Sequence, residues 1–162
     1  IFPRRQRTYR GFMAHYRAIV HSPAPAEKVF GYLADFATVA QWDPGVSHAE
    51  LIAGSPGRTG ARYQVITSNL GVALPLEYEI LEAIPPADGF AGRVVLEAQT
   101  PDFRSYDVIT VSPTGRGSEV VYDADLALNG PRRVFDPLLR LAFSVICARA
   151  RDGLAASLAR IN

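Results

Sequence analysis

The residues of this sequence that could do chemistry are aromatic and polar side chains on the inward faces of predicted strands and of one predicted helix. Tyrosine and tryptophan each combine an apolar ring with one polar atom. Several such rings around one interior would suit a cavity that holds an apolar ligand with a few oxygen atoms. The inward-facing candidates, some of them charged, are Trp42, Tyr63, Tyr78, Arg104, Tyr106, Asp107, Tyr122 and Arg149.

Each candidate also has a purely structural interpretation. The hydroxyls of Tyr78 and Tyr122 could bond to the backbone in the wall of a core. Trp42 could pack at a helix corner, and Arg149 could be solvated or paired with an acid at the surface. The joint pattern of these residues therefore carries more weight than any single member.

The sequence has no motif for metal binding, nucleophilic catalysis or phosphate binding. His15, His21 and His48 are scattered without a ligand spacing such as HExxH, and Cys147 stands in no recognisable motif. No GxSxG elbow occurs. The glycine-rich segment 54–60 lacks the lysine of a phosphate-binding loop and is typical of a hairpin turn. We therefore expect neither a metal nor a cofactor.

Length and composition predict one domain. The chain has 162 residues, of which 48% are hydrophobic, and this is enough to bury a core of ordinary size. No apolar run approaches the length of a membrane span. The single cysteine excludes an internal disulfide and is consistent with a reducing compartment, so we expect a cytoplasmic location. The expected partner is a hydrophobic small molecule, without nucleic acid or stable membrane insertion, and the protein could be a monomer or a homodimer.

Residues 1–12 differ in composition from the rest of the chain. They carry Arg4, Arg5, Arg7 and Arg10 and no acid, a pattern that could bind nucleic acid or an anionic membrane. The only methionine, Met13, stands directly before the first predicted strand. We therefore interpret residues 1–12 as a disordered basic extension without function, and residues 13–162 as the domain.

The segment 21–46 carries the clearest local signals. Pro25 suits the first position of a helix, where its missing N–H costs nothing, and Glu27 suits the positive end of the helix dipole. Apolar residues recur at helical spacing from 29 to 36. A short second helix is expected to follow and to end near Trp42.

Turn signals divide the remaining chain into hairpins. The seven predicted strands, including the one before the helices, cover 15–21, 47–53, 61–68, 72–83, 90–98, 103–112 and 118–128. Hairpins without intervening helices predict an antiparallel sheet with one wet face, and the alternating pattern turns Tyr63, Tyr78, Tyr122 and Leu126 inward. Strand 103–112 is ambiguous, because Ile109 and Val111, with Asp107 and Ser105, favour one face while Tyr106 and Val108 favour the other.

The final segment predicts one long helix that begins near 130–131, with a bend where Pro137 interrupts the first turns. At 1.5 Å per residue, about 25 residues would span about 38 Å, enough to cross the concave face of the sheet. The predicted buried stripe consists of Phe135, Leu138, Leu139, Ala142, Val145, Ile146, Ala150, Leu154 and Leu158.

These elements together resemble the START-like (SRPBCC) superfamily, which includes polyketide cyclase/dehydrase proteins, Bet v 1 type allergens and lipid carriers. The resemblance implies an α+β helix-grip fold, in which a curved seven-stranded antiparallel sheet wraps around a long C-terminal helix, with two short helices after the first strand. The matching residues are Pro25, Glu27, Val29, Phe30, Asp35, Phe36, Trp42 and Pro44.

The resemblance and the inward rings favour binding of a hydrophobic small molecule or lipid between the sheet and the C-terminal helix. The expected ligand contacts are Trp42, Tyr63, Tyr78, Tyr122, Leu126, Val145, Ile146 and Arg149. The alternative function is that of a polyketide cyclase/dehydrase (aromatase/cyclase), for which Arg104, Tyr106 and Asp107 would be the catalytic residues. A regulatory or protein-interaction module is a third possibility, which an exposed apolar patch without a cavity would favour.

Overall fold

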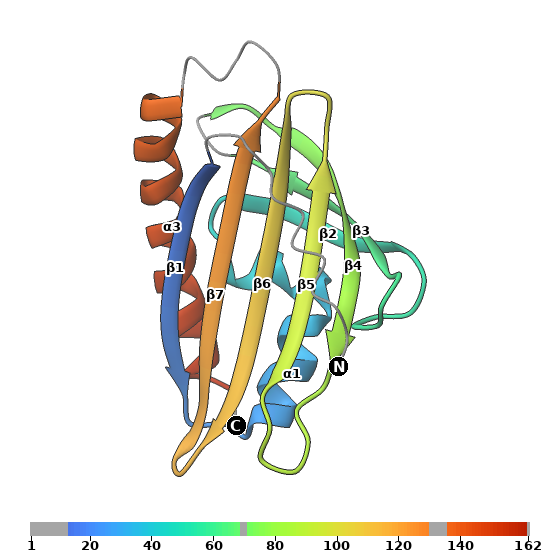
Figure 1. The fold of residues 1–162 in the computed structure, drawn as a ribbon, viewed down its shortest axis with the longest axis vertical. Coiled ribbons are helices and arrows are strands. Elements are labelled where there is room, and N and C mark those ends of the chain that lie inside the picture. Colours follow the sequence, from blue (N-terminus) through green and yellow to red (C-terminus); the bar gives the residue numbers. More distant parts are fainter. Residues whose placement is uncertain (1–12, 69–70, 130–135, 162) are drawn as a thin grey trace, which may run out of the picture.

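Seven antiparallel strands form one curved sheet with the spatial order β1-β7-β6-β5-β4-β3-β2 (Figure 1). The structure is a computed structural model and describes residues 13–68, 71–129 and 136–161. The strands are β1 (Met13–Ser22), β2 (Val46–Ala53), β3 (Arg62–Thr67), β4 (Leu74–Ile84), β5 (Gly92–Gln99), β6 (Phe103–Thr114) and β7 (Gly117–Leu128). Each predicted strand is confirmed within two residues at either end.

The helices follow the first strand and close the chain. They are α1 (Ala26–Ala34), the 3-10 helix η1 (Phe36–Thr38), α2 (Val39–Trp42) and α3 (Asp136–Leu158). Pro25 stands one residue before α1, so the predicted helix start is correct within one position. The predicted beginning of the last helix at 130–131 and the predicted extension 1–12 lie outside the described residues. Pro137 falls in the first turn of α3, where a proline requires no bend.

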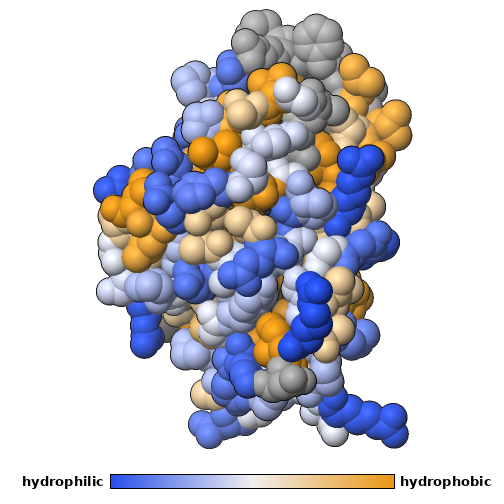
Figure 2. Space-filling model, turned by 180° about the vertical axis from the view of Figure 1, so that it is seen from behind, coloured by the Kyte–Doolittle hydropathy of each residue, from blue (hydrophilic) through white to orange (hydrophobic). Residues whose placement is uncertain are grey.

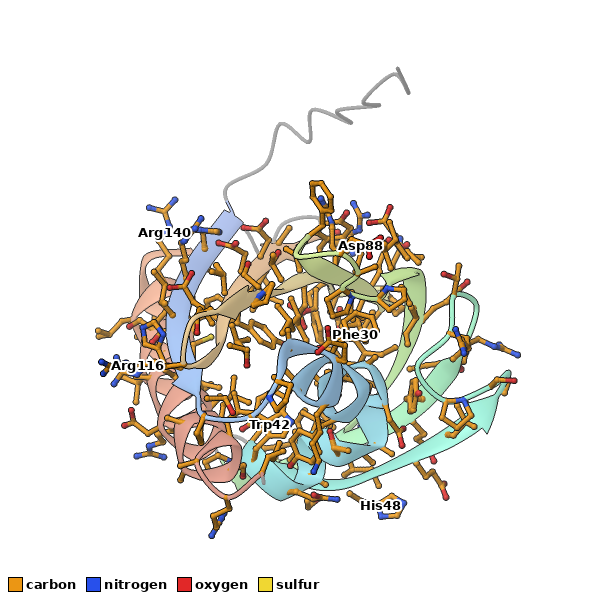
Figure 3. The ribbon with its side chains drawn as sticks, turned by 90° about the horizontal axis from the view of Figure 1, so that it is seen from below. Phe30, Trp42, His48, Asp88, Arg116 and Arg140 are labelled. Atoms are coloured by element: carbon orange, nitrogen blue, oxygen red, sulfur yellow. The ribbon has the colours of Figure 1, made fainter. Side chains whose placement is uncertain are left out.

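The concave face of the sheet encloses the helices, as the view from below shows (Figure 3). Helix α1 packs on β5, β6 and β7, while α3 packs on β1 and α2. The arrangement confirms the α+β helix-grip fold. The largest fully buried side chains of the core are Tyr63, Leu33, Ile80, Leu96, Ile109, Leu154 and Leu158.

One end of the fold is closed by short polar links between the sheet and the helices. The hydroxyl of Ser22 at the end of β1 donates to the carbonyl of Leu158 at the end of α3, with an O···O distance of 3.1 Å. The hydroxyl of Ser118 donates to the carbonyl of Ala24 at 3.0 Å. Nearby, α3 approaches α2 so closely that any side chain at Gly153 would collide with the carbonyl oxygen of Trp42.

The opposite end of α3 is packed differently. Leu138, Leu141 and Val145 expose most or about half of their side-chain surface. Apolar side chains are accordingly visible near the top of the molecule, the end at which α3 begins (Figures 1 and 2). The predicted buried stripe is therefore wrong for Leu138 and Val145, because only the inward flank of this half of α3 faces the sheet.

None of the helices in the described part of the chain is long and apolar enough to cross a membrane.

Candidate functional site

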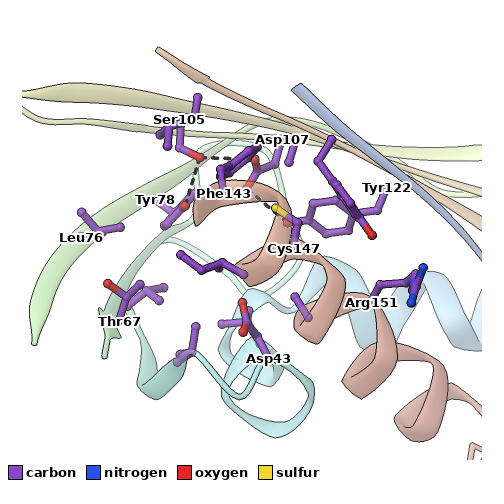
Figure 4. Close-up of a pocket in the computed structure, with 18 of the residues that line it drawn as sticks. Asp43, Thr67, Leu76, Tyr78, Ser105, Asp107, Tyr122, Phe143, Cys147 and Arg151 are labelled. Carbon is purple, nitrogen blue, oxygen red and sulfur yellow. Dashed lines mark hydrogen bonds between the residues drawn. The ribbon is translucent and has the colours of Figure 1, made fainter. Parts of the chain in front are cut away.

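A pocket of about 440 Å³ lies between the concave face of the sheet and the inward flank of α3 (Figure 4). Its volume is within the range of small-molecule sites, about 300 to 1,000 Å³. Apolar side chains make up most of the wall, and among them are Val39, Val46, Val65, Leu76, Ala124, Leu126, Leu128, Phe143, Ile146 and Leu154.

Two periodicities place these side chains. In the strands, alternate residues point to one face, so β6 presents Ser105 and Asp107 and β7 presents Tyr122 and Leu126 to the pocket. In α3, the lining residues recur at helical spacing over positions 143, 146, 147, 150 and 154. Most of the pocket wall is therefore built by regular elements.

A chain of hydrogen bonds crosses the sheet side of the pocket (Figure 4). The hydroxyl of Tyr122 donates to Oδ2 of Asp107 at 3.2 Å. The hydroxyl of Ser105 donates to Oδ1 of the same carboxyl at 3.3 Å. The hydroxyl of Tyr78 in turn donates to Oγ of Ser105, also at 3.3 Å. Three strands thus contribute to one polar group in an otherwise apolar wall.

Asp107 is the centre of this network and is only 5% exposed. Burial raises the pKa of its carboxyl to about 7, against the opposing effect of the bonds from Tyr122 and Ser105. The carboxyl therefore exchanges its proton near neutral pH. Burial, together with the charge of Asp107, holds the pKa of both Tyr78 and Tyr122 above the usual range, so both hydroxyls remain protonated donors.

A second carboxyl enters the pocket from the turn after α2. Asp43 lines the pocket, and its Oδ1 accepts a hydrogen bond from the backbone N–H of Gly45 at 2.8 Å. Burial raises the pKa of this carboxyl as well, against that hydrogen bond. The pocket therefore holds two carboxyl groups on different elements.

The tryptophan next to Asp43 supplies an unused donor. Trp42 is 5% exposed, and its indole N–H has no hydrogen-bond partner among the described residues. The indole packs edge-on against Tyr122, with a distance of 6.0 Å between ring centroids. A buried donor without a partner is costly.

Cys147 and Arg151 complete the polar lining from α3. Burial raises the pKa of the Cys147 thiol to about 12, which keeps it protonated and makes it a poor nucleophile. Arg151 is exposed, and its guanidinium donates to Oδ1 of Asp152 at 2.7 Å. It is the only cationic side chain among the lining residues in the described part of the chain.

Six residues predicted from the sequence line the pocket together. They come from α2, from three strands and from α3, and they are Trp42, Tyr78, Asp107, Tyr122, Leu126 and Ile146. The ambiguous strand 103–112 turns Ile109 and Val111 into the core, and Asp107 therefore faces the pocket.

Arg104 and Tyr106 do not line the pocket, and the expectation that they face the interior is wrong. They lie on the opposite face of β6, because neighbouring residues of a strand alternate. The guanidinium of Arg104 donates to both carboxylate oxygens of Glu97, with an Nη2–Oε2 distance of 2.9 Å, and lies 5.5 Å from the ring centroid of Tyr106. Both residues therefore take part in an outer-face cluster.

Three expected ligand contacts also lie elsewhere. Tyr63 is buried in the core, where its hydroxyl accepts a hydrogen bond from the N–H of Gly57 at 3.0 Å. Val145 is 47% exposed on the outer flank of α3. Arg149 is exposed beside a second, shallower depression near Gly153. None of the three lines the pocket that contains Asp107.

Sequence reasoning missed several polar residues of the pocket, among them Ser105, Cys147 and Asp43. The inward orientation of Ser105 follows from that of Ile109 and Val111, and so the strand pattern contained the signal. Cys147 follows Ile146 on the inward flank of α3. Asp43 belongs to a turn, and no periodic pattern indicates where a turn residue points. Among the described residues, no group of three histidine, cysteine or acidic side chains could hold a metal ion.

Comparison with known proteins agrees with the geometry. The family model described as polyketide cyclase/dehydrase and lipid transport matches residues 13–159. No curated protein matches the chain significantly.

Several solved structures share the fold at low sequence identity. The Zhui aromatase/cyclase from Streptomyces sp. R1128 is 13% identical, with a TM-score of 0.69 over 91% of this chain and 94% of that chain. A START superfamily protein from Mycobacterium smegmatis is 17% identical, with a TM-score of 0.68 over 91% and 97%. A STAR-related lipid transfer protein from Xanthomonas axonopodis is 20% identical, with a TM-score of 0.62 over 86% and 85%. These likenesses establish the fold.

Proposed function

Because this chain belongs to the polyketide cyclase/dehydrase and lipid transport family of the START-like superfamily, we propose that it binds a hydrophobic small molecule or lipid in the pocket between the sheet and α3. The observation that carries the proposal is an apolar pocket of about 440 Å³ with one hydrogen-bonded polar network in its wall. Apolar surface supplies affinity at about 25 cal/mol per Å² buried, and the polar network orients the ligand.

The polar groups predict where the ligand carries oxygen or nitrogen atoms. The carboxyl of Asp107, which accepts one hydrogen bond on each oxygen from Tyr122 and Ser105, retains lone pairs for a ligand donor. A molecule with an apolar body and a polar donor group would satisfy this carboxyl.

A second candidate function is that of a polyketide cyclase, and the pKa of Asp107 is the observation that favours it. With a pKa of about 7, the ionised carboxyl can accept a proton from the carbon between two carbonyl groups. The resulting enolate carbon would attack a second carbonyl carbon, and the new alkoxide would then take the proton back from the Asp107 carboxyl. In this function Arg104 and Tyr106 take no part because they lie on the outer face, while the hydroxyls of Tyr122 and Tyr78 position Asp107 and Ser105.

An interaction module is the weakest of the three alternatives. Such a module would have an exposed apolar patch and no internal cavity. The pocket beside α3 supports a small-molecule ligand instead.

Native mass spectrometry of protein purified from its source tests the binding proposal. We expect a retained apolar molecule, or saturable uptake of one from a library of apolar compounds. Absence of both would contradict the proposal. The mass of a retained molecule would also indicate its class.

The Asp107→Asn variant then separates the carrier from the cyclase. In a carrier, the variant should change the affinity for a bound molecule only modestly. In a cyclase, it should lower turnover of a poly-ketone substrate by about 100-fold or more and leave binding nearly intact. Asp123→Asn is the matched control, since Asp123 lies on the outer face of β7 beside Arg17.

A further inference from the structure

The pocket has an uneven balance of charge. Asp107 on β6 and Asp43 after α2 both line it, and they approach it from different sides (Figure 4). The lining residues in the described ranges include no lysine and no histidine. Their one cation, Arg151, is exposed and donates to Asp152. A ligand therefore meets acidic groups inside the pocket and a basic group only where the wall meets solvent.

This balance discriminates between ligands of different charge. A carboxylate at the end of an apolar ligand would add a third acid to a site that already holds two, without a buried cation to pair with it. A primary ammonium brings three N–H donors and a positive charge. Charge-assisted hydrogen bonds to a carboxylate are about twice as strong as neutral ones.

The surroundings of Asp107 also suit a cation. The rings of Trp42, Tyr78, Tyr122 and Phe143 line the same pocket, and aromatic faces attract ammonium groups. On the sheet side, the hydroxyls of Tyr122 and Ser105 hold the carboxyl in place and leave lone pairs of both oxygens unused.

We propose that the pocket selects its ligand by charge: the polar end of the ligand is a protonated amine that pairs with Asp107, and ligands that end in a carboxylate are rejected. This inference rests on the proposed binding function and names the chemical class of the ligand. The apolar body of the amine would occupy the part of the pocket lined by Leu126, Phe143 and Ile146.

Affinity for such an amine depends on pH through Asp107. The groups that face or influence this carboxyl are Tyr122 and Asp125 on β7, Tyr78 on β4, Asp43 after α2 and Cys147 on α3. The tyrosines and the thiol stay protonated at neutral pH, so the two pocket carboxyls are the groups that ionise. Because the ammonium pairs with the ionised form and the pKa of Asp107 is about 7, affinity rises with pH, by up to about 30-fold between about pH 5.5 and 8.5.

Three probes of the same shape test the charge selection by calorimetry. They are 2-(2-naphthyl)ethylamine, 2-(2-naphthyl)ethanol and 2-naphthylacetate, which share the ring and the chain length. We expect the order amine, alcohol, carboxylate at about pH 7.5, with the amine at least about tenfold tighter than the carboxylate. A smaller preference, or the reverse order, would overturn the charge selection.

Two variants test whether Asp107 causes the preference for the amine. In Asp107→Asn, the amine should lose its preference over the alcohol and its pH dependence. Asp123→Asn should behave as wild type, because this carboxyl pairs with Arg17 on the outer face. If Asp107→Asn does not fold, the pH series on the wild-type protein decides, and a pH-independent amine affinity overturns the inference.

Binding of the alcohol distinguishes a failure of the charge selection from a failure of the proposed binding function. Binding of the alcohol without any preference for the amine would overturn the charge selection and leave hydrophobic binding intact. Failure of all three probes to bind would contradict both.

Discussion

The two halves of α3 differ in how tightly they pack against the rest of the protein. In the C-terminal half, Leu158 is fully buried and its carbonyl accepts a hydrogen bond from Ser22. In the N-terminal half, Leu141 is 65% exposed, and the inward flank faces the pocket instead of a filled core. A helix that is packed tightly at one end can therefore lie farther from the sheet at the other end.

This difference explains how a pocket coexists with a stable core. Burial around α1 and the C-terminal half of α3 supplies the stability, and the polar links at Ser22 and Ser118 close that end. The pocket end of the fold can then remain unfilled. A filled core there would add packing free energy, but the fold does not depend on it. Variants that change only one half of α3 test whether the two halves contribute differently to stability and to binding.

The largest effect is expected for Leu158→Ala in the anchored half, a residue that does not line the pocket. It removes a fully buried side chain and should lower the free energy of unfolding by about 2 to 5 kcal/mol, measured by urea denaturation. The matched control on the same helix is Leu141→Ala, which should cost less than about 0.5 kcal/mol because this side chain is exposed. Equal losses in the two variants would contradict the contrast between the halves.

Gly153→Ala should have the next largest effect. Its methyl group would collide with the carbonyl oxygen of Trp42, and backbone atoms cannot move aside as a flexible side chain can. We expect a loss of about 1 to 3 kcal/mol in the free energy of unfolding. Gly31→Ala in α1 is the control, since a methyl group there meets nothing within 4 Å and should stabilise the helix slightly. A stable Gly153→Ala protein would mean that α2 and α3 are not in tight contact.

At the pocket end, the buried carboxyl predicts a pH effect on stability. Burial raises the pKa of Asp107 to about 7, so between about pH 4 and 7 the native state holds a proton that the unfolded chain has lost. The contribution is fully present below about pH 4, falls as pH rises and levels off above about pH 7. Asp107→Asn lacks it.

The difference in unfolding free energy between wild type and Asp107→Asn should therefore shift in favour of the variant by on the order of 2 kcal/mol from about pH 5 to pH 8. Urea denaturation at both pH values measures the shift. A difference that does not change with pH would show that Asp107 is not a buried carboxyl with a raised pKa.

The smallest effect is expected on the outer face of β6. Arg104→Ala removes a partly exposed ion pair with Glu97 and should cost about 1 kcal/mol or less. Tyr106→Phe should leave ligand affinity unchanged, whereas Tyr122→Phe should weaken binding because it removes a hydrogen bond to Asp107. Equal effects of the two tyrosine variants on calorimetric titrations would place the ligand somewhere other than the pocket.

Much of the fold could be predicted because hairpin turns and strand alternation are local patterns. The inward orientation of Tyr78, Tyr122 and Leu126 follows directly from the pleat. Val145 shows the limit of such patterns, since helical spacing groups it with Leu138 and Ala142 but does not state where the sheet ends beside the helix. That boundary depends on sheet curvature, which is a property of all seven strands together.

The site was harder to predict than the fold. The sequence predicts Asp107 as a site residue, but it predicts Arg104 and Tyr106 for the same site. Tyr106 precedes Asp107 directly and therefore points to the opposite face of the strand, as Arg104 does. The network through Ser105 to Tyr78 joins β6 to β4, two strands that are not neighbours in the sheet. A contact of this kind spans the hollow of a curved sheet, and no pattern along a single strand reveals it.

The most direct test of the account is to fill the pocket from α3 and to measure binding of 2-(2-naphthyl)ethanol by calorimetry. Ile146→Trp places a large ring where the ligand would lie, at a stability cost of about 1 to 3 kcal/mol, while Leu141→Trp adds the same ring to the exposed flank of the same helix. If the ligand occupies the pocket, Ile146→Trp loses binding and Leu141→Trp retains it. Unchanged binding in a folded Ile146→Trp protein would contradict the central claim.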